Sequence, residues 1–201
     1  MPTEQQNWDQ RYQQQDTPWD AGRPCEELAR VLDEYAIPPG RVLEPGCGTG
    51  ADCVYLASRG FDVLGIDIAP TAIMAAEKRA LDAGVRCRFT VADVFNLPDI
   101  GTEFPFIYDR GCYHVARQTD EAALVDVYDK LLAPGGLLLV LTGSSNEQNP
   151  PNSGPPRVSE EELRRAFSPG FKIVHLRECR LETQPGRNFS PLAWSLLLRK
   201  V

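Results

Sequence analysis

The sequence is poor in histidine and in basic residues, and it contains no long apolar run. Its two histidines and six cysteines show no CxxC pair or other metal-ligand spacing, which predicts free thiols in a reducing, cytoplasmic environment and no metal site. The net charge is −7, and because nucleic-acid binders need a basic surface, a nucleic-acid partner is not expected. The longest apolar run, residues 135–143, is too short to span a bilayer, and no secretory leader is expected.

The composition is that of one ordinary globular domain. Of 201 residues, 42% are hydrophobic and 24% are charged, which supplies enough apolar material for a single core. We therefore expect one domain over residues 1–201, acting as a monomer.

Strand-like and helix-like segments alternate through most of the chain. The strand-like segments are residues 41–44, 61–68, 85–91, 104–109 and 137–141, and the helix-like ones are residues 51–59, 70–81 and 120–132. This alternation predicts right-handed βαβ units, hence an α/β fold with a doubly wound, Rossmann-like sheet that is mostly parallel and has helices on both faces.

The C-terminal part has a different pattern. Ser159 and Glu162 form a capping-box pattern that predicts a helix over residues 159–167. Two β-rich stretches follow with no helix between them, at residues 171–181 and 192–201. They predict an antiparallel C-terminal hairpin at one edge of the sheet.

A glycine-rich loop, EPGCGTG at residues 44–50, joins the first strand to its helix. Glycines there permit a tight turn and let a ligand approach the backbone at a helix N-terminus. Asp67 ends the second strand, where a carboxylate can accept hydrogen bonds from ribose hydroxyls. The same loop satisfies the dinucleotide fingerprint, so an NAD(P)-dependent oxidoreductase remains a remote alternative.

Three features favour S-adenosylmethionine (SAM) over a dinucleotide. Glu44 stands just before the loop, where it can order the loop and reach the amino group of the methionine part. Asp93 ends the third strand, where it can accept from the adenine amino group, although it also suits a turn cap. The chain has no second domain for a hydride acceptor, and about 40 residues precede the first strand, whereas NAD folds usually begin with it.

These residues resemble those of class I SAM-dependent methyltransferases, and the resemblance runs nearly end to end. At four places the resemblance is to one group of these enzymes: residues 8–12 (WDQRY), 16–23 (DTPWDAGR), 108–111 (YDRG) and 154–158 (GPPRV). These segments are similar to those of the thiopurine S-methyltransferase and plant halide/thiol methyltransferase group. The resemblance implies that residues 1–40 form a helical cap over the cofactor and residues 41–201 a Rossmann-like core.

The resemblance also implies that the aromatic side chains of the cap contact SAM. These are Trp8, Tyr12 and Trp19, and the plant enzymes carry Trp where this chain has Tyr12. An aromatic face stabilises a sulfonium by cation–π attraction, although a Trp on such a helix is often a core anchor instead. The expected contacts of SAM, and of its product S-adenosylhomocysteine, are Trp8, Tyr12, Trp19, Glu44, Gly46, Cys47, Gly48, Gly50, Asp67, Ile68, Asp93, Val94, Asp109 and Arg110.

The expected acceptor side follows the fourth strand. Arg110 corresponds to an arginine near cofactor and substrate in the thiopurine enzyme, with a plain salt bridge as the alternative role. His114 is a candidate base for a thiol and equally suits packing. Arg110 and His114 are thus the candidate catalytic residues, and Arg110, Tyr113 and Arg157 the candidate acceptor contacts. The loop at residues 144–156 is long enough for a lid.

The same region indicates which acceptors to expect. No NPPY-like tetrapeptide, which amino-methylating enzymes of DNA and protein use, follows the fourth strand, and the NPPN run at residues 149–152 comes after the fifth strand. With the acidic charge, this favours methyl transfer to a small molecule, with neither nucleic acid nor membrane as partner. A sulfur acceptor is expected first and a halide second. O- or N-methylation of a metabolite and a SAM-binding protein without catalysis remain alternatives.

Overall fold

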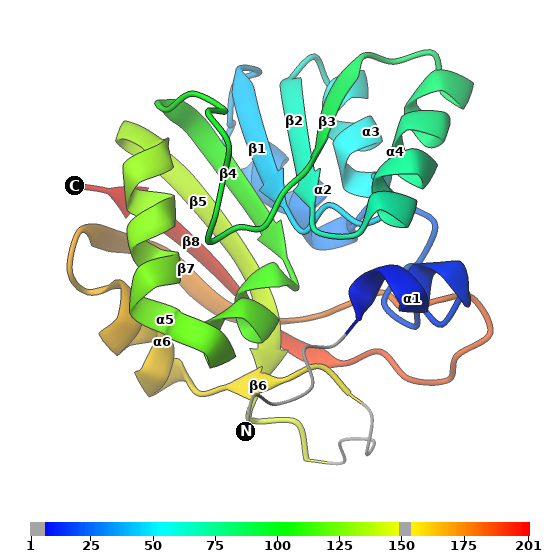
Figure 1. The fold of residues 1–201 in the computed structure, drawn as a ribbon. Coiled ribbons are helices and arrows are strands. Elements are labelled where there is room, and N and C mark those ends of the chain that lie inside the picture. Colours follow the sequence, from blue (N-terminus) through cyan, green and yellow to red (C-terminus); the bar gives the residue numbers. More distant parts are fainter. Residues whose placement is uncertain (1–6, 149–153) are drawn as a thin grey trace.

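The computed structural model describes residues 7–148 and 154–201, and these form one eight-stranded sheet with helices on both faces (Figure 1). The strand order is β3-β2-β1-β4-β5-β8-β7, and β6 pairs with β5 outside this path. In chain order the elements are α1 (Trp8–Gln13), α2 (Glu26–Glu34), β1 (Arg41–Pro45), α3 (Ala51–Ser58), β2 (Asp62–Asp67), α4 (Pro70–Asp82), β3 (Cys87–Val91), β4 (Phe104–Arg110), α5 (Cys112–Leu131), β5 (Leu132–Ser144), β6 (Arg157–Val158), α6 (Glu160–Phe167), β7 (Phe171–Arg180) and β8 (Leu192–Lys200).

The first five strands run parallel, with β1 between β2 and β4. The chain therefore winds outward in one direction through β2 and β3, and in the other through β4 and β5. The winding direction therefore changes between β1 and β4, and open α/β folds bind ligands outside the carboxyl ends of the strands at such a point.

The last two long strands form the antiparallel edge of the sheet. β8 pairs antiparallel with β5 on one side and with β7 on the other. The predicted α/β fold, with a doubly wound, mostly parallel sheet and an antiparallel C-terminal hairpin, is confirmed.

Two elements near the site differ from the predicted ranges. β5 covers Leu132–Ser144 rather than residues 137–141, because the Pro-Gly-Gly segment at 134–136 forms an irregularity within the strand pairing and not a loop. α5 begins at Cys112 rather than at residue 120. Its backbone is non-helical at Asp120, whose φ is −160°, so the predicted helix is only its second half.

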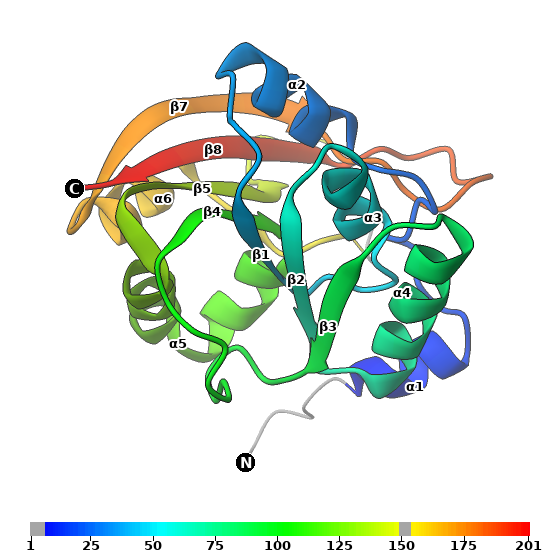
Figure 2. The same cartoon turned by 90° about the horizontal axis from the view of Figure 1, so that it is seen from above.

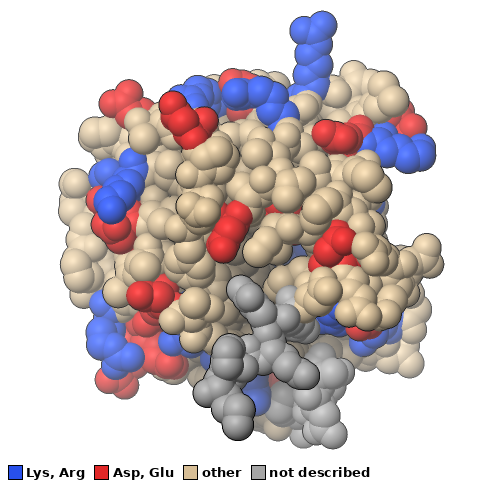
Figure 3. Space-filling view, viewed as in Figure 1, with Lys and Arg blue, Asp and Glu red and all other residues tan. Residues whose placement is uncertain are grey.

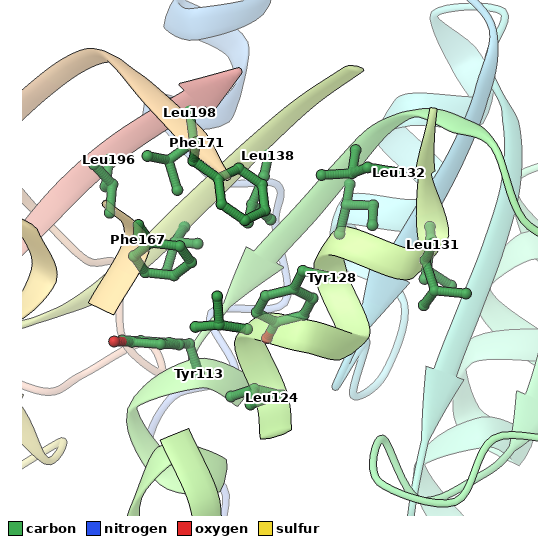
Figure 4. Packing of buried hydrophobic residues seen from close by; sticks show 14 of the residues in the cluster. Tyr113, Leu124, Tyr128, Leu131, Leu132, Leu138, Phe167, Phe171, Leu196 and Leu198 are labelled. Carbon is green, nitrogen blue, oxygen red and sulfur yellow. The ribbon is translucent and has the colours of Figure 1, made fainter. Parts of the chain in front are cut away.

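The core consists of one hydrophobic cluster on each face of the sheet. α2 and α3 contribute Leu28, Val31 and Leu56 to the cluster on one face, and Figure 2 shows these helices on the side of the sheet opposite α5 and α6. On the α5 and α6 face, Tyr128 and Phe167 pack against leucines of β5 and β8 (Figure 4). The sheet is therefore covered on both faces, which leaves its edges and ends for function.

Truncating Phe167 to alanine should cost about 3–5 kcal/mol of unfolding free energy, because its ring is fully buried between Tyr113 and Phe171. The matched control is Met74→Ala on the exposed face of α4, where the side chain is 64% exposed and the change should stay within about 0.5 kcal/mol. Urea unfolding measures both. Equal effects of the two substitutions would contradict the placement of Phe167.

Candidate functional site

The glycine-rich loop lies between the carboxyl end of β1 and the start of α3. Gly46 and Gly50 both have left-handed backbones, with φ of +65° and +75°. A Cβ added to Gly46 would lie 2.8 Å from Cβ of Cys112, and one added to Gly50 would lie 2.8 Å from Cβ of Ala76. Both sterics and backbone conformation therefore require glycine at these positions.

Asp67, the last residue of β2, fixes this loop. Its Oδ2 accepts the backbone N–H of Gly48 at 2.9 Å, and its Oδ1 accepts that of Ala69 at 2.9 Å. Burial raises the pKa of Asp67, and these two hydrogen bonds oppose the rise. Each carboxylate oxygen retains a second lone pair, so the residue can still receive the hydroxyls of a ribose.

An open hollow of about 470 Å³ lies beside Asp67, lined by Ile68, Val91, Ala92, Asp93, Asn96, Leu97 and Pro98. Ile68 is 47% exposed in this hollow, which is unusual for isoleucine and suits the face of a planar ring. Asp93 lines the hollow and also caps the following turn, since its Oδ1 accepts the N–H of Phe95 at 2.9 Å. Val94, in contrast, packs against the hydrophobic core.

The three predicted cap aromatics form one cluster above the glycine loop. The rings of Trp8 and Tyr12 lie 5.3 Å and 6.0 Å from that of Trp19, both edge-on, and the indole N–H of Trp19 donates to the Tyr12 hydroxyl at 3.3 Å. A Cβ added to Gly48 would lie 2.9 Å from that hydroxyl. Figure 1 shows α1 at the carboxyl edge of the sheet. The structure therefore places the cluster next to the glycine loop, and its contact with a cofactor stays a prediction.

Arg110, the last residue of β4, joins the cap to the loop between β7 and β8. Its guanidinium donates to the carbonyl of Glu182 at 2.8 Å and to that of Trp19 at 3.5 Å. Burial lowers and the nearby Asp52 raises the pKa of Arg110, with a net upward shift, so the group stays cationic. Its Nε has no hydrogen-bond partner among the described residues, so the side chain retains one donor.

Glu44 lies beneath the glycine loop and is only 4% exposed. Its Oε2 accepts the thiol of Cys53 at 2.9 Å. Burial, and then the neighbouring Asp52, raise the pKa of Glu44 well above its usual value. The side chain of Glu44 thus contacts α3, while its loop-ordering role and an indirect contact with a methionine amino group stay predictions.

Asp109 and Tyr113 have structural positions that sequence patterns did not indicate. The carboxylate of Asp109 is fully buried and accepts the N–H of Tyr113 at 3.0 Å and the hydroxyl of Tyr128 at 2.6 Å. The ring of Tyr113 is fully buried in the core beside Phe167. Because α5 begins one residue before Tyr113, its first turn directs this ring inward. The predicted acceptor contact by Tyr113 and cofactor contact by the Asp109 side chain do not fit these positions.

His114 has the environment of a packing residue. Its Nδ1 accepts the N–H of Gly143 at 3.3 Å, which uses the lone pair that a base needs. Burial, followed by the charge of Arg110, lowers the pKa of His114 to about 4. A neutral imidazole whose lone pair is engaged does not suit the role of general base that the sequence also allowed.

A second cavity, of about 660 Å³, opens at the ends of β5 and β6. It is lined by Gln118, Ser145, Glu147, Gly154, Pro155, Pro156, Arg157, Phe189, Pro191 and Leu192. The predicted acceptor contact Arg157 is among these residues. Sequence analysis did not identify Gln118 and Phe189, because neither belongs to a motif. They meet in this cavity because the loop between β7 and β8 packs there. Part of the predicted lid at 144–156, including the run at 149–152, lies outside the described residues.

Charged side chains of both signs lie on the surface, and the cysteines form no disulfides in the structure. Figure 3 shows acidic and basic side chains mixed around the margins of one face, with a mostly uncharged middle. All six cysteines are free. Within residues 7–148 and 154–201, no three His, Cys, Asp or Glu side chains group as metal ligands, and no helix is long and apolar enough to cross a bilayer.

Known proteins are similar to this chain over most of its length. The sequence profile of the family described as thiopurine S-methyltransferase matches residues 3–194. A probable thiol methyltransferase 2 of Arabidopsis thaliana is 30% identical over 189 residues, covering 92% of this chain and 82% of the relative. A 2-heptyl-1-hydroxyquinolin-4(1H)-one methyltransferase of Mycobacteroides abscessus is 32% identical over 165 residues, covering 82% and 72%.

Solved structures share the fold. One, from work on the conversion of a disulfide bond into a thioacetal group during echinomycin biosynthesis, has a TM-score of 0.79 and 27% identity, covering 91% of this chain and 84% of that chain. The magnesium protoporphyrin IX methyltransferase of Synechocystis with bound SAM has a TM-score of 0.67 and 18% identity, covering 99% and 86%. At that identity the second likeness concerns the fold alone.

Gly48→Ala should weaken binding of S-adenosylhomocysteine about tenfold or more, because the new methyl group would displace the Tyr12 hydroxyl. Gly84→Ala is the matched control, since Gly84 also has a left-handed backbone, with φ of +67°, but nothing lies within 4 Å of an added Cβ. Calorimetric titration with S-adenosylhomocysteine compares them. Adding Tyr12→Phe to Gly48→Ala should restore part of the affinity, and equal losses in the two alanine variants would contradict the proposed crowding.

The lowered pKa of His114 predicts a pH-dependent stability difference between the protein and His114→Gln. The pKa is about 4 in the folded protein against an ordinary 6.5, so the folded state binds fewer protons between these values. The protein should therefore lose stability relative to the variant as the pH falls from about 6.5 to 4, by on the order of 3 kcal/mol in total. The free energies of unfolding of both proteins are measured by urea unfolding across this pH range. If the two change in parallel with pH, His114 is not buried in its neutral form.

Proposed function

Because the chain belongs to the thiopurine S-methyltransferase family and is a SAM-dependent methyltransferase, we propose that it methylates a small-molecule acceptor through a nucleophilic sulfur. The observation that carries the choice of sulfur is that neither Asp109 at the end of β4 nor His114 in α5 is free to act as a base. The buried carboxylate of Asp109 accepts hydrogen bonds from the N–H of Tyr113 and the hydroxyl of Tyr128. The ring lone pair of His114 accepts the N–H of Gly143. A thiolate needs little or no base, whereas a neutral hydroxyl or amine often does.

The chain's own residues position the reactants and exclude water. SAM, when bound, supplies a methyl group on a sulfonium, which is a good leaving group. The acceptor sulfur forms its bond to the methyl carbon as the bond to the sulfonium sulfur breaks in line, and the thiol proton passes to water. The products are the methylated sulfide and S-adenosylhomocysteine. In-line placement, provided by the cap and the glycine loop, is the main catalytic contribution.

We place the cofactor across the carboxyl edge of β1, β2 and β3. The proposed contacts are Asp67 for the ribose, Asp93 and Ile68 for adenine, and the cluster of Trp8, Tyr12 and Trp19 above the sulfonium. Positive φ along the glycine loop, the free lone pairs of Asp67 and the exposed face of Ile68 support this placement. These residues supply the hydrogen-bond acceptors and the apolar surface that the ribose and adenine of SAM require.

We place the acceptor in the cavity of Arg157. A volume of about 660 Å³ is within the range of sites for small organic molecules, and a halide would fill little of it. Phe189 and three prolines supply apolar walls, and Arg157 supplies a cation for an anionic group. A ring-bearing thiol fits this lining best.

A hydroxyl-bearing heteroaromatic acceptor is the second candidate. The relative named 2-heptyl-1-hydroxyquinolin-4(1H)-one methyltransferase, at 32% identity, favours it. A hydroxyl acidic enough to ionise near neutral pH would also need no strong base. We further expect the protein to work as a cytoplasmic monomer, without nucleic acid, which its net charge of −7 and six free thiols support.

The deciding experiment offers methyl-labelled SAM and a panel of acceptors to the purified protein. The panel contains heteroaromatic thiols, small thiols, sulfide, a hydroxyquinolone, iodide, phenols and amines, with products identified by mass spectrometry. We expect turnover of sulfur acceptors, fastest with heteroaromatic thiols. Transfer to the hydroxyquinolone alone would favour the second candidate, and transfer only to amines or ordinary phenols would contradict both.

Arg157→Ala should raise the KM for an anionic acceptor about tenfold and leave the KM for SAM unchanged, because Arg157 lines the acceptor cavity only. Arg187→Ala, an exposed position in the β7–β8 loop outside the cavity lining, is the control. Steady-state kinetics with a heteroaromatic thiol measures both. An unchanged acceptor KM in Arg157→Ala would remove Arg157 from the site.

A further inference from the structure

Arg79, in the last turn of α4, contacts both the glycine loop and the cap. Its Nε donates to the carbonyl of Thr49 at 2.8 Å, and its Nη2 donates to the Thr49 hydroxyl at 3.0 Å. Its Nη1 donates to the carbonyl of Gly22 at 3.0 Å. One guanidinium thus connects residue 49 of the cofactor loop to residue 22 of the cap.

Asp20 completes this connection from the cap side. Its Oδ2 accepts the hydroxyl of Thr49 at 2.8 Å, and its Oδ1 accepts the N–H of Gly22 at 2.9 Å. The Thr49 hydroxyl therefore accepts from Arg79 and donates to Asp20, which uses its single donor and one of its two lone pairs. We call Asp20, Gly22, Thr49 and Arg79 the clasp.

The other end of α4 is also attached to the cap. Ala69, the N-cap residue of α4, supplies no side-chain hydrogen bond. Asp9 of α1 accepts the N–H of Thr71 at 2.7 Å in its place, and this hydrogen bond lowers the pKa of Asp9. Carboxylates are favoured at helix N-termini, so α1 docks where α4 lacks its own cap.

These attachments flank the aromatic cluster. Asp9 follows Trp8 in the sequence, and Asp20 follows Trp19. We propose that Arg79 is a positioning residue whose clasp holds the cap closed over the glycine loop and thereby sets the affinity and lifetime of bound SAM and S-adenosylhomocysteine. The inference depends on cofactor binding at this loop and is independent of which acceptor is methylated.

The test compares Arg79→Gln with Lys78→Ala, a change at the neighbouring residue of the same helix, whose exposed ammonium pairs with Asp82 and is outside the clasp. Calorimetry and stopped-flow displacement measure the Kd and dissociation rate of S-adenosylhomocysteine. We expect Arg79→Gln to raise both about tenfold, and Lys78→Ala to change neither. Hydrogen exchange of residues 8–22 in the ligand-bound protein should also rise in Arg79→Gln alone.

A second variant separates positioning from loss of folding. Thr49→Val preserves the carbonyl that accepts from Arg79 but removes the hydroxyl between Arg79 and Asp20. It should therefore raise the Kd and the dissociation rate of S-adenosylhomocysteine, but by less than Arg79→Gln. Arg79→Lys, which has one ammonium group in place of the forked guanidinium, should bind S-adenosylhomocysteine more tightly than Arg79→Gln and less tightly than the unchanged protein. A folded Arg79→Gln protein with unchanged Kd, dissociation rate and exchange of the cap would overturn the proposal, as would equal effects from Lys78→Ala.

Discussion

The carboxylate of Asp67 is the contact on which the site depends. It holds the N–H of Gly48 in the glycine loop and that of Ala69 before α4, so one residue at the end of β2 positions two neighbouring segments. The doubly wound sheet makes this possible, because β1 and β2 end side by side at the carboxyl edge. Arg110, Asp93 and Ser145 follow or end other strands at the same edge and border the remainder of the site.

Besides the apolar packing of α2, charged and polar groups attach the cap to this edge. Arg110 contacts the carbonyls of Trp19 and Glu182, and Asp52 accepts the N–H of Cys25 and the hydroxyl of Tyr108. Removing one member of such a buried set leaves its partners unsatisfied, which makes the arrangement specific even where its net stabilisation is small. These contacts dock the cap in one orientation with its aromatic side chains beside the glycine loop.

The sequence was informative where a local backbone requirement fixes the residue type. Gly46 and Gly50 occupy crowded, left-handed positions that require glycine, and the alternation of strands and helices followed from periodicity. The orientation of side chains after β4 was not predictable, because it depends on the helix starting at Cys112. Gln118 and Phe189 come from distant segments, and Arg79 lies in an ordinary helical pattern, so their roles emerge only from packing.

The most direct test of this account is a crystal structure of the protein with S-adenosylhomocysteine. We predict adenine in the hollow lined by Ile68 and Asp93, the ribose hydroxyls on Asp67 and the thioether beneath Tyr12 and Trp19. The cap should be closed by the contacts seen from Arg79 to Gly22 and from Thr49 to Asp20. A nucleoside bound elsewhere, or a cap displaced from the glycine loop in the complex, would contradict the account.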